Sequence, residues 1–178
     1  MLGTVELLKL VKEQKLVENL CQRELENPEG TGFDLRVGEV YKLKDGDAFL
    51  GQEERHTPDI DLVAKFGTEK EYTLLPGEFV LVKTLEKVNM PSDIASAITP
   101  RSTLQRSGVL FLSAACPPGY SGELTFGLHN AGKNLFRFEL GARFAHARFF
   151  RTGTNISDYR GQWQGGRVST QGKKETQV

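Results

Sequence analysis

The chain has 178 residues, of which 38% are hydrophobic, and its 23 Lys and Arg side chains balance 23 Asp and Glu side chains. A chain of this length buries one substantial core rather than two, so we expect a single domain. The neutral net charge argues against a partner that is bound through bulk charge, such as a nucleic acid or a membrane surface. Any anion-binding site must therefore be a local cluster of side chains.

The cysteines and the first apolar run indicate a cytoplasmic protein that binds no metal through its own side chains. Cys21 and Cys116 lie far apart and lack the spacing of a zinc site or a disulfide scaffold, so we expect buried, inert thiols. Glu6 and Lys9 interrupt the first apolar run, which is typical neither of a signal peptide nor of a membrane span. We expect no membrane partner and no nucleic-acid partner.

The first predicted element is an amphipathic helix. Val5, Leu8 and Val11 recur at helical spacing, and Lys and Glu side chains occupy many of the other positions. This pattern predicts a helix over about residues 4–14. After it, the sequence changes to short segments that are separated by turn residues.

Short strands are predicted after this helix. Near alternation of apolar and polar residues predicts a strand over 33–43, and the segment 71–91 predicts a hairpin of two strands about the turn at Pro76 and Gly77. Four later segments have the same character: 108–115, 123–132, 135–141 and 142–150. Many short strands with Gly and Pro between them predict an all-β barrel or jelly roll behind a short N-terminal helix, in one domain over 1–151.

The segment 152–178 differs from the rest because it is rich in glycine and lacks apolar periodicity. Such a composition is typical of a disordered tail. Tyr159 and Trp163, however, are costly to leave in water. Their presence favours a flexible tail that closes over a ligand and stacks an aromatic ring on it.

The stretch TPRSTLQRSG at 99–108 combines cationic and hydroxyl side chains at a turn. The guanidinium groups of Arg101 and Arg106 suit phosphate oxygens, and the hydroxyls of Ser102 and Thr103 are hydrogen-bond donors. A solvated turn with incidental charges is the alternative. Tyr120 lies in a Gly-rich turn, where it can belong to the core or pack against a sugar.

Five segments together resemble the dCTP deaminase and dUTPase superfamily, in order and in spacing: GFDLRVG, PRSTLQRSG, PGYSGELTFGLHNAG, GARFAHARFF and YRGQWQGG. The N-terminal helix, and the arginine four residues beyond Ser102, are more similar to the dCTP deaminase branch. The resemblance implies a distorted β-barrel or jelly roll, assembled as a homotrimer whose active sites are shared between subunits.

The resemblance also implies roles for individual residues. Arg101, Ser102 and Arg106 match positions that hold the triphosphate and line the catalytic pocket. Tyr120 matches the aromatic residue that packs on the deoxyribose and leaves no room for a 2′-hydroxyl, while Tyr159 and Gln162 match the tail that closes over the nucleotide. Mg²⁺ is then expected to bind mainly through phosphate and water oxygens.

Three positions depart from the family pattern. Gly127 occupies the position of the glutamate that serves the deaminases as general acid and base, and Pro117 occupies that of an aspartate on which trimeric dUTPases depend. His146 stands where the family usually has glutamine. Four side chains are candidates to supply the missing base: Asp34, Asp59, Asp61 and His129.

The sequence therefore leaves three functions open. The first is hydrolytic deamination of dCTP to dUTP and ammonia. Gly127 favours the second, dUTP pyrophosphatase activity on the same fold. Pro117 and Gly127 together favour the third, a non-catalytic nucleotide sensor or structural protein.

Overall fold

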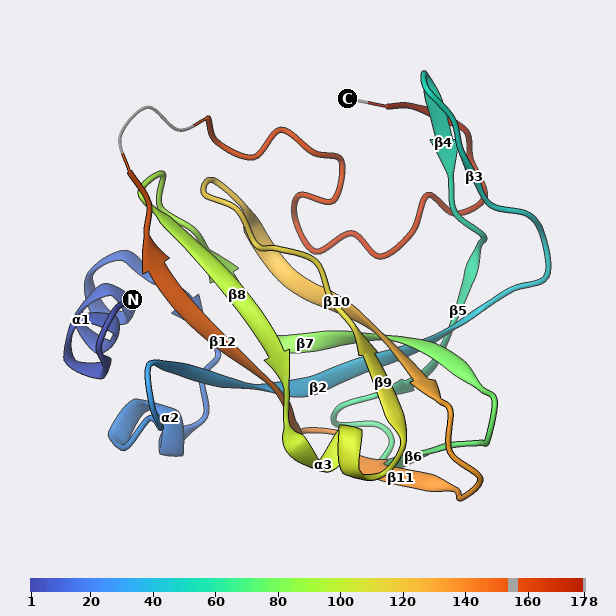
Figure 1. Ribbon diagram of the computed structural model, residues 1–178, viewed down its shortest axis with the longest axis horizontal. Helices are drawn as coiled ribbons and strands as arrows, with labels where there is room; N and C mark the ends of the chain where they lie inside the picture. Colours follow the sequence, from blue (N-terminus) through green and yellow to red (C-terminus); the bar gives the residue numbers. More distant parts are fainter. Residues whose placement is uncertain (154–156, 178) are drawn as a thin grey trace.

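A curved sheet forms the body of the computed structural model, which describes residues 1–153 and 157–177 (Figure 1). Its central strands are hydrogen-bonded in the order β8-β12-β2-β7-β10-β9, with β5 paired to β2 and β1 paired to β7. The strands in chain order are β1 (Val17–Glu18), β2 (Gly32–Leu43), β5 (Ile60–Lys65), β7 (Phe79–Asn89), β8 (Ile94–Pro100), β9 (Val109–Leu112), β10 (Ser121–Asn130) and β12 (Arg143–Arg151). The prediction of an all-β fold is confirmed.

A backbone bridge between Ser96 and Cys116 nearly closes this sheet into a barrel. Ser96 lies on β8 at one end of the strand order, and Cys116 follows β9 at the other end. The amide of Ser96 donates to the carbonyl of Cys116 over 2.9 Å, and the amide of Cys116 donates back over 3.2 Å. The architecture is thus the distorted barrel or jelly roll that the sequence predicted.

The described part of the chain contains three helices beside the barrel. Helix α1 (Thr4–Gln14) confirms the predicted helix, and its buried Leu7 and Leu10 face the core. Two short helices, α2 (Gln22–Glu26) and α3 (Ser102–Arg106), were not predicted. The phosphate-binding turn expected at 99–108 therefore contains one helical turn. None of the described helices is long and apolar enough to cross a membrane.

The hairpin predicted about Pro76 and Gly77 is wrong, although both of its strands exist. β6 (Glu71–Leu74) pairs with β11 (Phe136–Glu139), and β7 pairs with β2 and β10 instead. The buried side chain of Asn130 explains the difference, since its Nδ2 donates to the carbonyls of Leu74 and Asn134. These bonds hold the chain that leads into β11 beside the end of β6.

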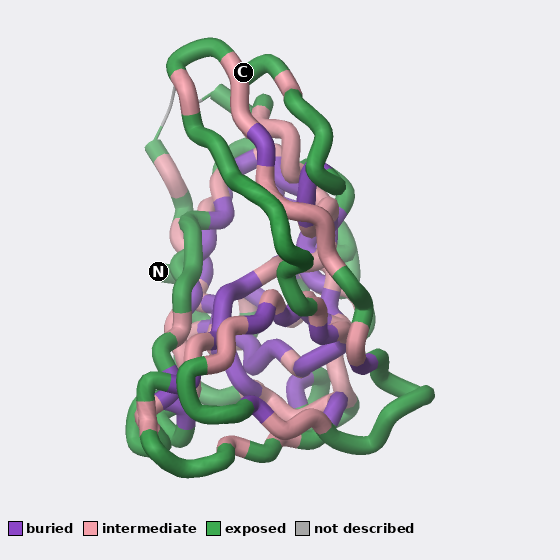
Figure 2. The backbone as a smooth tube through the Cα atoms, turned by 90° about the vertical axis from the view of Figure 1, so that its right-hand side faces the viewer, coloured by how far each residue is buried: buried purple, intermediate pink, exposed green. Residues whose placement is uncertain are grey.

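The core fills the interior of the barrel, where buried backbone segments converge in Figure 2. Along β7, buried and partly exposed residues alternate without interruption. Edge-to-face contacts between aromatic rings connect neighbouring strands, as for Phe33 on β2 with Phe149 on β12, and more distant strands, as for Phe126 on β10 with Phe144 on β12. Each fully buried side chain of this size contributes about 1.5–3 kcal/mol through removal of apolar surface from water.

The C-terminal segment, residues 157–177, crosses the upper end of the barrel in Figure 1 and supplies one strand of a small sheet. This sheet has the order β13-β4-β3 and consists of β3 (Phe49–Leu50), β4 (Glu54–His56) and β13 (Glu175–Thr176). The domain boundary expected at residue 151, and the flexibility expected for 152–178, stay predictions. Residues 154–156 and 178 of that segment lie outside the described residues.

Candidate functional site

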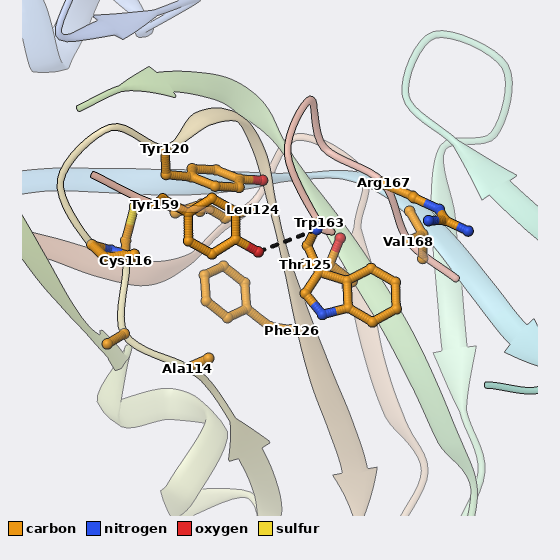
Figure 3. Close-up of a pocket in the computed structure, with 12 residues that line it drawn as sticks. Ala114, Cys116, Tyr120, Leu124, Thr125, Phe126, Tyr159, Trp163, Arg167 and Val168 are labelled. Atoms are coloured by element: carbon orange, nitrogen blue, oxygen red, sulfur yellow. Dashed lines mark hydrogen bonds between the residues drawn. The ribbon is translucent and has the colours of Figure 1, made fainter. Parts of the chain in front are cut away.

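A cavity of about 340 Å³ lies between the loop before β10, the first half of β10 and the C-terminal segment (Figure 3). Four of its residues come from the C-terminal segment, which therefore covers the cavity. The lining residues are Ala114, Ala115, Cys116, Pro117, Tyr120, Leu124, Thr125, Phe126, Tyr159, Trp163, Arg167 and Val168. This mostly apolar and aromatic lining suits a flat ring with few polar atoms.

The cavity brings Tyr120 and Tyr159 together. Their ring centroids lie 5.4 Å apart in an edge-to-face arrangement with an interplanar angle of 78°. The hydroxyl of Tyr120 donates to the carbonyl of Glu123 over 2.7 Å, and burial raises the pKa of Tyr120 to about 12. Tyr120 therefore acts as a neutral, fixed wall of the cavity. The hydroxyl of Tyr159 accepts a hydrogen bond from the amide of Trp163 (Figure 3).

Two further polar groups line this cavity. The hydroxyl of Thr125 is buried and has no hydrogen-bond partner among the described residues, so a ligand with a polar edge would supply one. The thiol of Cys116 is also buried, and burial raises its pKa to about 12. A thiol with such a pKa stays protonated at neutral pH, which agrees with the expected inert role of Cys116.

The C-terminal segment is attached to the turn that precedes β10 through close backbone contacts. The amide of Tyr159 donates to the carbonyl of Pro118 over 2.7 Å, and the amide of Gly165 donates to that of Ser121 over 2.8 Å. A Cβ atom on Gly166 would meet the carboxylate of Glu123 and lie 3.0 Å from its backbone nitrogen. Glycine at position 166 is therefore required for this approach.

A second cluster surrounds the buried carboxylate of Asp34 on β2. Arg101 donates to Oδ2 of Asp34, and Arg143 donates to the same atom over 2.8 Å. Nδ1 of His146 lies 2.9 Å from the other carboxylate oxygen, and the backbone amide of Asp34 donates to the buried Glu24. Asp34 therefore anchors cationic side chains from β12 and from the start of α3.

Ionised Asp34 is the favoured state in this cluster. Burial opposes its ionisation, but the hydrogen bond from His146 and the charge of Arg101 outweigh burial and hold the pKa of this carboxyl below its ordinary value. A carboxylate so strongly paired is a poor proton acceptor. The geometry of Asp34 thus fits an anchor for Arg101 better than the general base expected from the sequence.

The residues predicted to bind phosphate gather around α3. Arg101 and Thr103 line a second cavity of about 310 Å³, together with Arg143. Ser102, Thr103 and Arg106 are exposed to solvent. In Figure 1, α3 lies at the lower end of the molecule, whereas the C-terminal segment and the loop before β10 lie at the upper end. Within a single chain, the residues predicted to bind phosphate therefore lie far from the cavity that Tyr120 and Tyr159 line, which we call the tyrosine-lined cavity.

His129 and Gln162 belong neither to the tyrosine-lined cavity nor to the cavity beside α3. His129 is near the far end of β10, where its Nδ1 lies 3.2 Å from the carbonyl of Glu78, and it does not line the tyrosine-lined cavity. Nε2 of Gln162 donates to the carbonyl of Thr176 within the C-terminal segment. The other two aspartates suggested as bases pair with Lys44, at 2.8 Å for Asp59 and 3.3 Å for Asp61.

Sequence reasoning did not assign Arg143 or His146 to the site. Tyr159 and Trp163 were expected to belong to a tail that stacks an aromatic ring on a ligand, and both residues line the cavity. The register of β12 against β2 places His146 directly opposite Asp34, 112 positions away in the sequence. A contact of this range has no local sequence pattern.

The described residues contain no group of three or more His, Cys, Asp or Glu side chains that could hold a metal ion. The donors available near α3 are instead hydroxyl and guanidinium groups, which suit phosphate oxygens. A divalent cation fits this donor set only as a companion of a phosphorylated ligand.

Comparison with known proteins gives a consistent result. A family model described as dCTP deaminase-like matches residues 1–152. The dCTP deaminase of Pyrococcus abyssi is 32% identical over 158 residues, which cover 88% of this chain and 90% of that protein. The dUMP-forming dCTP deaminase of Dictyoglomus turgidum is 27% identical over 154 residues, covering 84% of this chain and 79% of that protein.

One solved structure supports the fold. The 2′-deoxycytidine 5′-triphosphate deaminase of Agrobacterium tumefaciens superposes with a TM-score of 0.65 at 15% sequence identity. The superposition covers 83% of this chain but 46% of that structure, so this chain spans about half the length of that protein.

Proposed function

This chain belongs to the dCTP deaminase-like family, and from that premise we propose that it binds a deoxypyrimidine nucleoside triphosphate and converts dCTP to dUTP and ammonia. The observation that carries the proposal is the cavity at Tyr120 and Tyr159, part of whose wall is formed by the C-terminal segment. Its aromatic and apolar walls suit a pyrimidine and a deoxyribose.

Tyr120 is the proposed determinant of the sugar. Its ring is buried and is held in place by the hydrogen bond to the carbonyl of Glu123. A rigid ring at the cavity wall would exclude a 2′-hydroxyl by steric contact, whereas a mobile side chain would move aside and admit it. This reasoning supports deoxyribonucleotides over ribonucleotides as ligands.

The triphosphate is proposed to bind at α3 through Arg101, Ser102, Thr103 and Arg106. Asp34 and its neighbours hold the guanidinium of Arg101 in one place, which lowers the cost of ordering it around a phosphate. Mg²⁺ would accompany the nucleotide, neutralise phosphate charge and be bound mainly by phosphate and water oxygens.

We propose a homotrimer in which α3 of one copy completes the tyrosine-lined cavity of its neighbour. A row of mainly apolar residues crosses the sheet at one register and supports such an assembly: Leu62, Tyr41, Leu81, Gly127 and Leu112. Directly paired residues share one face of a sheet. Leu62 and Leu112 are 50% and 55% exposed in the single chain, and burial against a second copy would remove this apolar surface from water.

The lining of the tyrosine-lined cavity also favours two alternative functions. No carboxylate and no histidine line the tyrosine-lined cavity among the described residues. Hydrolysis of dUTP to dUMP and pyrophosphate, with a water activated beside the phosphates, is the second candidate function. A deoxynucleotide sensor without turnover is the third.

A product assay separates these candidates. The purified protein is incubated with Mg²⁺ and with dCTP, dUTP, dTTP or their ribose counterparts, and both products and bound nucleotide are measured by mass spectrometry. Ammonia with dUTP from dCTP supports the deaminase, pyrophosphate from dUTP supports the pyrophosphatase, and binding without products supports the sensor. If no deoxypyrimidine nucleotide binds and none is converted to a product, the proposal is wrong.

A pair of variants tests the cavity itself. Tyr120→Ala should admit ribonucleotides that the native protein rejects, because the ring wall is removed. Tyr120→Phe keeps the ring and is the matched control, so it should retain the preference for deoxyribose. Equal sugar preference in both variants would remove Tyr120 from the site.

A further inference from the structure

The indole ring of Trp163 is held between the cavity and the small sheet that contains β4. Trp163 lines the tyrosine-lined cavity (Figure 3), and the Cζ atom of Arg55 on β4 lies over its ring at 4.7 Å from the ring centroid. The Cζ atom of Arg167 lies 5.7 Å from the same centroid. Guanidinium groups at these distances are attracted to the electron-rich face of an indole ring.

The two arginines differ in their other contacts. Arg167 pairs with the carboxylate of Glu175, where Nη1 donates over 3.1 Å. The Nε and Nη2 atoms of Arg55 are buried and have no hydrogen-bond partner among the described residues. The face of Trp163 and the charge of the nearby Glu175 carboxylate therefore compensate for burying this part of Arg55.

The segment that carries Arg55 is bound to the C-terminal segment at several points. β4 pairs with β13, with Arg55 directly opposite Glu175. Just after β4, the amide of Thr57 donates to Oγ1 of Thr170 over 2.9 Å, and the amide of Thr170 donates to Oγ1 of Thr57 over 2.9 Å. These reciprocal bonds fix the position of the C-terminal segment along β4, and they therefore help to fix the position of Trp163.

We propose that Arg55 is a positioning residue for ligand binding, which holds the indole of Trp163 as a wall of the tyrosine-lined cavity against the ring of the bound ligand. The inference rests on the proposed function of that cavity. It assigns a role in binding to the β3–β4 segment, which lies outside every motif that the sequence analysis identified. Arg55 acts through Trp163 and touches no reacting atom.

The test exploits the fact that Trp163 is the one tryptophan in the chain, so its fluorescence reports on this site alone. Arg55→Leu removes the cation and leaves a shorter aliphatic side chain, and Arg55→Lys restores a cation. Glu54→Gln is the matched control, since it removes an exposed ion pair with Lys174 on the same strand and leaves Arg55 in place. Binding of dCTP and dUTP is measured by calorimetry, independently of fluorescence.

In the native protein, we expect the nucleotide to bind and to change the emission of Trp163. Arg55→Leu should weaken binding about tenfold, shift the emission of the free protein to longer wavelength and reduce the change on binding. Arg55→Lys should restore most of the affinity, and Glu54→Gln should bind as the native protein does. If the native protein turns over nucleotide, KM should rise in Arg55→Leu while kcat changes little.

Two contrary results are distinguishable. Calorimetric binding that is equal in the native protein and in both Arg55 variants, with unchanged emission, would overturn the role of Arg55 and leave the proposed function intact. Absence of calorimetric binding in the native protein would overturn the proposed function, and the role of Arg55 would be lost with it. Thermal unfolding of each variant establishes that it is folded before binding is measured.

Discussion

The phenyl ring of Phe79 occupies the space into which a side chain at Gly127 would project. A Cβ atom at position 127 would lie 2.8 Å from Cε2 and 3.0 Å from Cζ of Phe79, and 3.2 Å from Cβ of Leu112. The place at which the resemblance implies a catalytic glutamate is therefore filled by an aromatic ring from β7. Restoring a carboxylate there requires that the ring move.

Gly127→Glu alone should thus destabilise the fold by about 1–3 kcal/mol through overpacking. Adding Phe79→Ala should recover part of that loss, because the ring that collides with the new side chain is gone. Urea unfolding of the single and double variants measures both effects. Faster release of ammonia from dCTP by the double variant than by the native protein or by Phe79→Ala alone would show that a carboxylate at position 127 can serve deamination.

Asp34→Asn should be among the most damaging polar substitutions in the barrel. The carboxylate is 1% exposed and compensates Arg101 and Arg143, so its loss leaves two partly buried cations without their partner. We expect a decrease of about 3 kcal/mol in the free energy of unfolding. Asp59→Asn, which breaks an exposed pair with Lys44, is the control and should cost less than about 1 kcal/mol. Similar losses in both variants would contradict an anchoring role for Asp34.

Glu39 makes the stability of the barrel sensitive to acid. Burial raises its pKa, but hydrogen bonds from Lys83 and Tyr41 outweigh burial and lower the pKa from 4.5 to about 2. A carboxyl whose pKa is lower in the folded state stabilises the fold above its unfolded pKa, and this stabilisation is lost as the pH falls through the folded value. The free energy of unfolding should therefore fall between about pH 4.5 and pH 2.

Glu39→Gln isolates this contribution. In urea unfolding measured at neutral pH and near pH 3, the variant should show a smaller difference than the native protein, by on the order of 1–2 kcal/mol after allowance for solvent screening. Glu13→Gln, at an exposed position of α1, should leave the difference unchanged. An unaltered pH dependence in Glu39→Gln would assign the acid sensitivity to other carboxyl groups.

Arg106→Ala should weaken binding of a deoxypyrimidine triphosphate by about 1.5–3 kcal/mol if Arg106 contacts phosphate, because charge-assisted hydrogen bonds have that strength. Its neighbour on α3, Gln105, is also exposed, so Gln105→Ala is the matched control and should bind normally. Calorimetric titration of the triphosphate and of the corresponding monophosphate tests the assignment. A loss of equal size for both ligands would place Arg106 away from the β- and γ-phosphates.

Two adjacent glycines allow a test of how the C-terminal segment attaches. Gly165 and Gly166 both have positive φ angles, of 77° and 74°, so alanine strains the backbone similarly at either position. A Cβ on Gly166 would collide with Glu123, whereas a Cβ on Gly165 would meet nothing within 4 Å. Gly166→Ala should therefore detach the segment and shift the emission of Trp163 to longer wavelength, and Gly165→Ala should not. Equal spectra for the two variants would contradict this attachment.

Local pattern accounts for the elements that the sequence predicted well. The apolar spacing in α1 and the near alternation along β2 are properties of a few consecutive residues, and they predicted that these elements form. They did not predict which face is buried in α1, because the structure buries Leu7 and Leu10 and leaves Val5 85% exposed. The failed hairpin at Pro76 and Gly77 marks the limit of this reasoning. A turn residue shows where the chain changes direction, but the partner of each strand depended on Asn130, far away in the sequence.

The sequence by itself determined the fold class, the family and the residue types available for binding, because periodicity, turn chemistry and motif spacing are local quantities. Only the tertiary structure decided that Arg101 is held by Asp34, that Tyr120 meets Tyr159, and that Arg55 lies over Trp163. These contacts join residues that are distant in the chain. They follow from strand order, register and close packing, which are properties of the whole barrel and of no single segment.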